Sequence, residues 1–158
     1  MIVPVGVILA RSIWNPVFLA LALWREARGS SIEAKVAVAH SIMNRVEKPS
    51  WWGKTLSEVL GKRWQYSSLA APNDPQLLLW PRPEDGSFQE CLSVARAVIG
   101  KTEDNPFPGA DSYFDSSISA PKWAVASSFR GQVDSPHGNT LMFYDVDHDW
   151  EAPVTGHV

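Results

Sequence analysis

Cysteine is almost absent from this chain of 158 residues, because Cys91 is the only one. A single cysteine excludes an intramolecular disulfide and a multi-cysteine metal site, and we expect Cys91 to be a small buried hydrophobe. The motifs GxSxG and HExxH and a glycine-rich phosphate loop are missing as well. The sequence therefore carries no signature of a serine hydrolase, a zinc protease or a nucleotide-binding enzyme, and we expect no metal and no cofactor.

Positive charge is also scarce, since the net charge at pH 7 is -3. Such a chain has no basic field to hold a phosphate backbone, which argues against nucleic acid as a partner. The first ten residues, MIVPVGVILA, are apolar, but no basic residue precedes them and they are too short to span a bilayer. We expect no signal peptide and no stable membrane insertion, and we predict that residues 1–14 pack on the domain.

What the chain does contain is a globular composition, with 45% hydrophobic and 20% charged residues. A chain of this length can bury its own core, so residues 1–158 are predicted to form a single domain, and a monomer is expected. Eight tryptophans are unusual for this length. They are expected either to pack the core or to line a groove for a ligand with flat apolar faces, such as a sugar.

Hydrophobic periodicity and capping residues predict helices in four places. The first covers residues 16–28, with Asn15 as its N-cap, Pro16 in its first turn and Gly29 as a left-handed stop. The other three are predicted to begin at capping boxes, at residues 30–33, 55–58 and 87–90.

Two proline-containing stretches, residues 63–86 and 105–123, are predicted to be long loops, because the first shows no helical period longer than one turn and the second is similar. Loops of this length in compact domains are usually functional or mobile. The segment 139–150, NTLMFYDVDHDW, is predicted to be a strand or a buried extended segment. These elements indicate a mainly α fold of the α+β type, a compact helical domain with long groove-forming loops and a small β element.

The histidines and aspartates favour structural roles over metal binding. His40 lies near the core face of the second predicted helix, where we expect a hydrogen-bonded structural histidine. Asp145, Asp147 and Asp149 share one face if the chain is extended, but the glycine and distal glutamate of a calcium loop are missing. A solvated acidic edge is the favoured interpretation.

Glu26, in the stretch LWREARGSS, is the main candidate for chemistry. It lies near the C-terminal end of the first predicted helix, where the helix dipole disfavours negative charge, and Gly29 is expected to let other segments come close. A glutamic acid kept protonated by a desolvated pocket can donate a proton to the leaving oxygen of a glycosidic bond. The competing hypothesis is a helix-end ion pair with Arg25 or Arg28, which would favour the ionised form.

The same residues resemble a known family. The E-A-R-G turn and the following AVA...NR helix, within LALWREARGSSIEAKVAVAHSIMNRV, are similar to the opening of the spore-cortex-lytic cell wall hydrolase family (SleB-like). The segments WQYSSL, GADSYFDSSISAPKWA and HGNTLMFY resemble later family segments in the same order. The resemblance covers about Ala20 to Tyr144. It implies a lysozyme-like fold that cleaves the glycan strands of peptidoglycan, many members being lytic transglycosylases.

Position by position, the resemblance implies that Glu26 is the catalytic acid. The residues that it implies for substrate binding are Gln65, Tyr66 and Ser67 in the groove segment and Tyr113, Trp123 and Asn139 in the second wall. The chain also departs from the family pattern. Ser112, Phe114 and Thr140 stand where the family has histidines, and Ser30 stands where it usually has an acid. The roles of those family side chains are therefore not carried over.

Within that resemblance, we favour a lytic transglycosylase, in which one carboxyl suffices because the sugar's own 6-hydroxyl attacks the anomeric carbon. Hydrolysis by a muramidase needs a second carboxylate about 5 to 9.5 Å from the first. Asp111 and Asp115 are candidates for it, since Glu33 is predicted to cap the second helix. Two further hypotheses are a catalytically inactive peptidoglycan-binding protein and a structural assembly protein. We also expect a bacteriophage endolysin, held in the host cytoplasm before its release to the cell wall.

Overall fold

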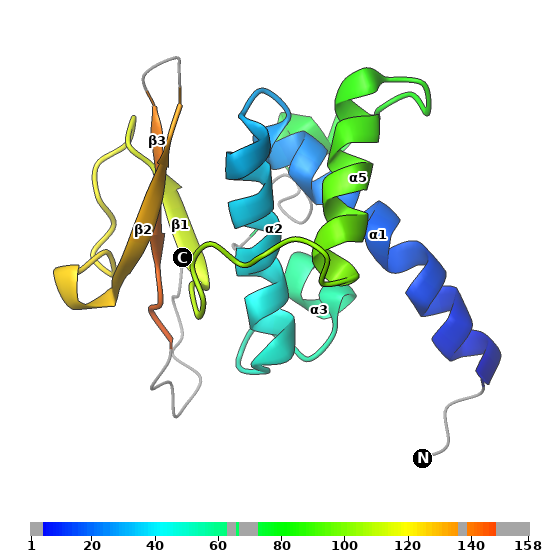
Figure 1. Cartoon of the computed structure of the whole chain (residues 1–158), viewed down its shortest axis with the longest axis horizontal. Coiled ribbons are helices and arrows are strands. Elements are labelled where there is room, and N and C mark those ends of the chain that lie inside the picture. The colour runs from blue at the N-terminus through cyan, green and yellow to red at the C-terminus, as the bar shows by residue number, and fades with distance from the viewer. Residues whose placement is uncertain (1–4, 63–65, 67–72, 136–138, 148–158) are drawn as a thin grey trace.

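The computed structural model describes residues 5–62, 66, 73–135 and 139–147, with side chains from Ile13 onward. Within these residues, the helices form one layer and a small antiparallel sheet lies beside them (Figure 1). The predicted mainly helical α+β fold class is therefore confirmed. None of the described helices is long and apolar enough to cross a membrane.

The first helix, α1, covers Val5–Ala27 and has Pro16 inside it, so the predicted start at Asn15 was wrong. Proline removes one main-chain hydrogen bond, but helix formation is cooperative and the apolar sequence continues on both sides. The C-terminal half of α1 contains its fully buried side chains, Leu19, Ala20, Ala22 and Leu23. The N-terminal half extends away from the other elements (Figure 1).

The second helix, α2, covers Ile32–Glu47 and begins one residue later than predicted. The hydroxyl of Ser31 accepts a hydrogen bond from the amide of Ala34 at 3.1 Å, so Ser31 is the N-cap and the prediction for Ser30 was wrong. Either serine can cap a helix, and the choice between neighbours depends on the turn that precedes them. Glu33 is an exposed residue in the first turn of α2.

The third helix, α3 (Leu56–Leu60), begins with the predicted capping box of Thr55 and Glu58. The last helix, α5 (Gly86–Ile99), is capped instead by Asp85, which accepts a hydrogen bond from the amide of Ser87. The predicted box of Ser87 and Glu90 was therefore wrong. Asp85, just before the helix, already accepts a hydrogen bond from a free amide of the first turn. Glu90 instead pairs with Lys35 of α2.

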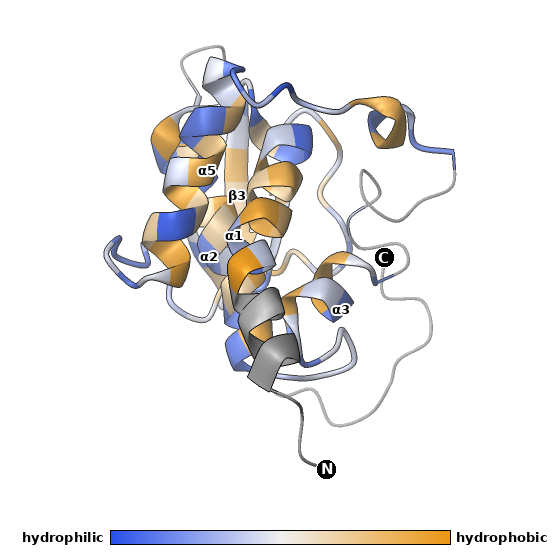
Figure 2. Cartoon of the chain, turned by 90° about the vertical axis from the view of Figure 1, so that its right-hand side faces the viewer, coloured by the Kyte–Doolittle hydropathy of each residue, from blue (hydrophilic) through white to orange (hydrophobic). Residues whose placement is uncertain are grey.

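Helices α1, α2 and α5 pack against one another and form most of the core. They carry both hydrophobic and hydrophilic stretches, as expected for helices buried on one side (Figure 2). Cys91 of α5 is fully buried, as predicted. His40 of α2 has its Nε2 3.0 Å from the carbonyl oxygen of Glu103, which confirms a hydrogen-bonded structural histidine.

Three short strands form the sheet, in the order β1-β3-β2, with both pairs antiparallel. They are β1 (Ser112–Asp115), β2 (Phe129–Asp134) and β3 (Thr140–Tyr144). Only β3 lies in the segment predicted to be extended. β1 lies in a region predicted to be a loop, and β2 was not predicted. Strands of four to six residues show too few alternations to stand out in a sequence.

The two faces of the sheet have different neighbours. In the register, Tyr113 lies opposite Phe143 and Phe114 lies opposite Met142, so Tyr113 and Phe114 face opposite sides. Tyr113 and Phe143 pack with the helical core. On the other face, the rings of Phe114 and Tyr144 stack with centroids 5.9 Å apart. A residue on the face of Tyr113 therefore lies between the sheet and the helices.

The prediction of a solvated acidic edge after β3 was wrong for the two aspartates that the structure describes there. Asp145 and Asp147 are both buried. Asp145 pairs with Arg130, with Oδ2 3.4 Å from Nη2, and its amide donates to the carbonyl of Ser128. The sequence pattern could not show that Arg130 of β2 pairs with Asp145. Asp149 lies outside the described residues.

Candidate active site

Glu26 lies in the last turn of α1, and its side chain is exposed. A tight turn follows, in which the amide of Ser30 donates to the carbonyl of Ala27 at 2.9 Å. Gly29 in this turn does not adopt the predicted left-handed conformation, and a Cβ added there would meet no atom within 4 Å. The expectation that Gly29 lets other segments come close was therefore wrong. The glycine instead leaves open space beside the turn.

Arg25, which precedes Glu26, is buried and binds the segment that contains the 3₁₀ turn η1 (Pro75–Leu78). Its Nε and Nη2 donate to the carbonyl of Leu79 at 3.3 and 3.0 Å. Its guanidinium carbon lies 4.7 Å from the ring centre of Trp80. Burial lowers the pKa of this guanidinium. The contacts of Arg25 thus attach residues 77–80 to the end of α1.

Arg28, on the other side of Glu26, binds the same segment. Its Nη1 donates to Oε1 of Gln76 at 2.9 Å and to the carbonyl of Trp24 at 3.0 Å. The amide of Gln76 in turn donates to the carboxylate of Asp74 at 2.8 Å, which caps η1. Both arginines therefore bind the segment 74–80. An ion pair with Glu26, the competing hypothesis for this stretch, is not required to account for two arginines at the end of α1.

Two tyrosines lie close enough to Glu26 for its charge to act on them. Tyr66 is only 4% exposed, and Tyr113 on β1 packs against Phe143 with ring centres 5.5 Å apart. Burial raises the pKa of both phenols, and the negative charge of Glu26 raises them further. Both side chains are therefore neutral near pH 7, and each hydroxyl can donate a hydrogen bond.

Arg45 of α2 supports Tyr66, although the sequence analysis did not select it. It is buried, and its Nε donates to the carbonyl of Asp111 at 2.6 Å. Its guanidinium carbon lies 5.4 Å from the ring centre of Tyr66 and 5.1 Å from that of Trp52. The positive charge counteracts part of the effect of burial on the pKa of Tyr66. The sequence feature that could have identified Arg45 is its position in the AVA...NR segment, which carries the family resemblance.

Asp111, one of the two candidates for a second carboxylate, has a structural role. It is buried, and its carboxylate accepts hydrogen bonds from the amides of Val146 and Asp147, both at 3.0 Å, and from the hydroxyl of Ser112 at 2.9 Å. These bonds join the start of β1 to the chain that follows β3. A carboxylate used in this way is poorly placed to activate water.

Asp115, the other candidate, lies at the end of β1 on the same face as Tyr113. Its Oδ1 accepts a hydrogen bond from the amide of Ser117 at 2.8 Å. It lines a hollow of about 210 Å³, together with Gly29, Ser31 and other residues. The hollow connects the turn after Glu26 with the strand that carries Tyr113. Of the two aspartates, Asp115 is therefore the one that lines a hollow beside the turn that follows Glu26.

The structure brings several of the predicted substrate-binding residues together. Tyr66 and Tyr113 lie near Glu26, and Asn139 lines the same hollow as Asp115. The other two residues of the predicted groove segment, Gln65 and Ser67, lie outside the described residues.

Trp123 lies elsewhere. Its ring contacts those of Phe114 and Tyr144, with centroids 5.9 and 5.7 Å apart. These rings belong to the face of the sheet opposite Tyr113. The structure thus separates Trp123 from Tyr113, although the resemblance assigned both to one wall. Trp123 follows β1 in a turn, and a sequence resemblance does not show on which face of the sheet the chain returns after a strand.

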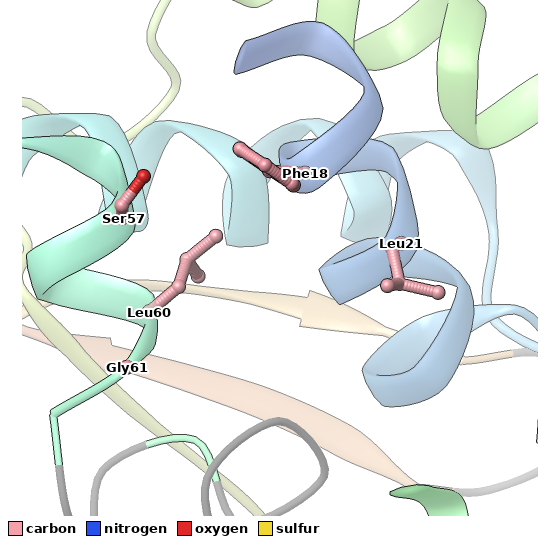
Figure 3. A pocket seen from close by; sticks show the side chains of 5 residues that line it. All are labelled: Phe18, Leu21, Ser57, Leu60 and Gly61. Atoms are coloured by element: carbon pink, nitrogen blue, oxygen red, sulfur yellow. The ribbon is translucent and has the colours of Figure 1, made fainter. Parts of the chain in front are cut away.

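A separate hollow of about 220 Å³ lies between α1 and α3 (Figure 3). Phe18 and Leu21 of α1 line one side, and Ser57 and Leu60 of α3 line the other. Apart from the hydroxyl of Ser57, the lining side chains are apolar. This hollow has no acid or base and is not a candidate for the catalytic site.

The arrangement around Glu26 is suited to acid–base chemistry on a large substrate. The exposed carboxyl is open to a polymer, and its charge acts on the phenols of Tyr66 and Tyr113, which are neutral near pH 7. A carboxyl in this setting can donate a proton to a leaving group and then accept a proton from an attacking group.

Comparison with protein families finds a match to a family described as Cell Wall Hydrolase, over residues 29–144. The match covers more than half of the chain and contains α2, α5 and the whole sheet. It begins just after Glu26, so the assignment of that residue rests on its own surroundings and on the resemblance of its E-A-R-G turn. No curated protein and no solved structure shows a significant match.

Proposed function

Since the chain belongs to the cell wall hydrolase family, we propose that it cleaves the bond between N-acetylmuramic acid (MurNAc) and N-acetylglucosamine (GlcNAc) in bacterial peptidoglycan, with Glu26 as general acid and base. The family suggests peptidoglycan degradation. One observation supports the role of Glu26: it is an exposed carboxyl at a helix end whose charge acts on two phenols, those of the buried Tyr66 and the half-buried Tyr113. The position at the C-terminal end of α1 disfavours negative charge there, which helps an acid to hold its proton.

The proposed reaction is that of a lytic transglycosylase. Protonated Glu26 donates its proton to the glycosidic oxygen while the bond from that oxygen to C1 of MurNAc breaks, and GlcNAc leaves with a free hydroxyl. Positive charge develops on the MurNAc ring. The ionised Glu26 then takes the proton of the 6-hydroxyl as the oxygen of that hydroxyl bonds to C1. The product is a 1,6-anhydro-MurNAc end, no water is consumed, and Glu26 recovers its proton.

Hydrolysis by a muramidase is the second candidate, and the position of Asp115 favours it. Asp115 shares a strand face with Tyr113 and lines the hollow beside the turn after Glu26, so it is a described carboxylate placed to activate a water in that hollow. Mass spectrometry of the released muropeptides separates the two reactions. Anhydro ends support the transglycosylase, whereas reducing MurNAc ends would replace it with the muramidase.

Catalysis is distinguished from simple binding by the substitution Glu26→Gln, which keeps the size of the side chain and removes its proton transfer. We expect lysis of purified cell walls to fall by a factor of about 10² to 10⁴, because a positioned acid or base contributes about that much, while wall binding stays unchanged. Retained lysis would reject Glu26 as the acid and base. Loss of both lysis and wall binding would instead favour a structural role for Glu26, and no wall binding by the unaltered chain would favour a structural assembly protein.

A role as a bacteriophage endolysin in the host cytoplasm stays a prediction. It is tested by producing the chain inside bacteria with and without a separate pore-forming membrane protein. Lysis only in the presence of the pore agrees with an endolysin that waits in the cytoplasm.

A further inference from the structure

An exposed apolar segment is attached to the turn of α1 that carries Glu26. Its side chains are Leu78, which is 84% exposed, Leu79, and Trp80, which is 69% exposed. Single exposed hydrophobic residues are common on protein surfaces, but a contiguous apolar patch usually marks a binding site. Three large apolar residues in a row therefore point to a ligand.

This segment is held in place by hydrogen bonds from Arg25 and Arg28, the arginines on either side of Glu26 in the sequence. Arg25 donates to the carbonyls of Leu77 and Leu79, and Arg28 donates to the side chain of Gln76. A buried guanidinium loses much of its hydration, so these acceptors are needed to stabilise Arg25 where it lies. The exposed side chains thus have a defined position relative to α1.

The ring of Trp80 has one face covered and one face open. The guanidinium of Arg25 lies over the ring, 4.7 Å from its centre. Because the side chain is still 69% exposed, the opposite face is open to solvent. A flat ring fixed from one side and open on the other suits the flat C–H face of a sugar ring, which buries apolar area against it without a hydrogen-bond partner.

We propose that Trp80 is a stacking platform for one N-acetylhexosamine ring of the glycan strand, at a distance from the bond that is cleaved. Arg25 and Arg28 act as positioning residues, because they link this platform to the same helix turn as Glu26. This inference rests on the proposed function and extends it with a substrate-binding residue. Sugars held beyond the cleaved bond align the strand, so that remote binding energy helps to orient the reacting bond.

The test measures binding in proteins that all carry Glu26→Gln, so that cleavage does not alter the walls. Trp80→Ala, Trp80→Phe and Trp14→Ala are compared for binding to purified peptidoglycan and to tetra-N-acetylchitotetraose. Trp14 is the matched control, since it is 54% exposed and lies on α1 away from the platform. We expect Trp80→Ala to weaken binding about tenfold, from the apolar area lost, Trp80→Phe to weaken it less than threefold, and Trp14→Ala to leave it unchanged.

Equal binding by Trp80→Ala and Trp14→Ala would overturn the proposal. Vesicles of phosphatidylglycerol test whether the segment binds a lipid surface instead: loss of vesicle binding with unchanged glycan binding would also overturn it. Thermal unfolding of each variant shows whether the fold is intact, and the Trp80→Phe variant keeps the test valid if Trp80→Ala does not fold. Failure of the proposed function is seen separately, as lysis retained by Glu26→Gln with Trp80 unaltered.

Discussion

The guanidinium carbon of Arg45 lies 5.4 Å from the ring centre of Tyr66, and both side chains are almost fully buried. A buried cation is costly unless other groups stabilise it, and Arg45 has the carbonyl of Asp111 and several aromatic faces around it. These contacts leave Tyr66 little freedom to move. Arg45, which has no direct role in the proposed reaction, therefore helps to fix Tyr66, a phenol on which the charge of Glu26 acts.

The first prediction concerns the hydroxyl of Tyr66. Tyr66→Phe keeps the ring over Arg45 and removes only the donor, so we expect the fold to persist and kcat on solubilised glycan to fall about 10- to 100-fold, with a smaller change in KM. A hydrogen bond to a charged group is worth about 1.5 to 3 kcal/mol, which corresponds to this range. Tyr144→Phe is the control, because Tyr144 packs on the outer face of the sheet. Equal kcat for both variants would show that Tyr66 only packs.

The second prediction distinguishes Asp111, which precedes β1, from Asp115, the last residue of β1. Asp111→Asn should destabilise the fold by about 1 to 3 kcal/mol, because the buried carboxylate accepts two amide hydrogen bonds that an amide side chain cannot both accept. Asp115→Asn should leave stability within about 0.5 kcal/mol, since this side chain lies at the edge of a hollow. Urea unfolding measures both.

Activity of the same variants tests the reaction type. A transglycosylase without a second carboxylate should keep wall lysis within about tenfold in Asp115→Asn, as no proton transfer is lost. A loss of at least 100-fold in a stable protein would instead favour the muramidase, because that is about the size of a missing general base.

The third prediction concerns the contact between α2 and α5. Nζ of Lys35 lies 2.6 Å from Oε1 of Glu90, and the exposed fractions of the two side chains are 3% and 40%. Glu90→Gln leaves a buried ammonium without its counter-charge, and we expect a loss of about 1 to 3 kcal/mol in unfolding free energy. This is less than for a fully buried pair because Glu90 is partly in water. Lys35→Met removes the buried charge itself and should lower the unfolding free energy by less than Glu90→Gln does. The reverse order in urea unfolding would contradict this account.

The fourth prediction concerns alkaline pH. Burial raises the pKa of the Cys91 thiol from 9.0 to about 11. As the pH rises, the unfolded chain therefore releases this proton first, so the contribution to stability is complete below about pH 9 and is lost by about pH 11. Tyr66 and Tyr113 act in the same direction at higher pH, because burial raises the pKa of both phenols.

Unfolding free energy measured between pH 8 and 11 checks this point. The unfolding free energy of the unaltered protein should fall across this range. The fall should be smaller in Cys91→Ala, by up to about 2.7 kcal/mol, because this is the free energy that corresponds to raising a pKa from 9.0 to about 11. Parallel curves for the two proteins would show that the thiol is not what makes the fold sensitive to alkali.

Local patterns predicted the helices where periodicity and capping agreed. The box at Thr55 and Glu58 and the apolar stripe of α5 are examples, since both depend on residues a few positions apart. The start of α1 was missed because Pro16 is a frequent first residue of a helix and here lies inside one. β1 was missed because it is stabilised by pairing with β3, which lies far away in the sequence. β2 pairs with β3 in a local hairpin and was missed because so short a strand shows few alternations of polar and apolar residues.

In the candidate site, too, the residues that lie in local motifs could be predicted, and the contacts between distant segments could not. Glu26, Tyr66 and Tyr113 were found through short motifs. The contact of Arg25 with Trp80 could not be predicted, because it depends on how residues 73–80 fold back onto α1. The distinction between Asp111 and Asp115 likewise depends on which backbone amides lie near each carboxylate.

The most direct test of the central claim compares muropeptides released from purified walls by the unaltered protein, Glu26→Gln and Glu33→Gln. Glu33 is a matched control, as it is an exposed glutamate on the other side of the same helix junction. We predict 1,6-anhydro-MurNAc products from the unaltered protein and from Glu33→Gln, and a loss of at least about 100-fold from Glu26→Gln. Release of the same products at the same rate by Glu26→Gln would contradict the assignment of Glu26 as the catalytic acid and base.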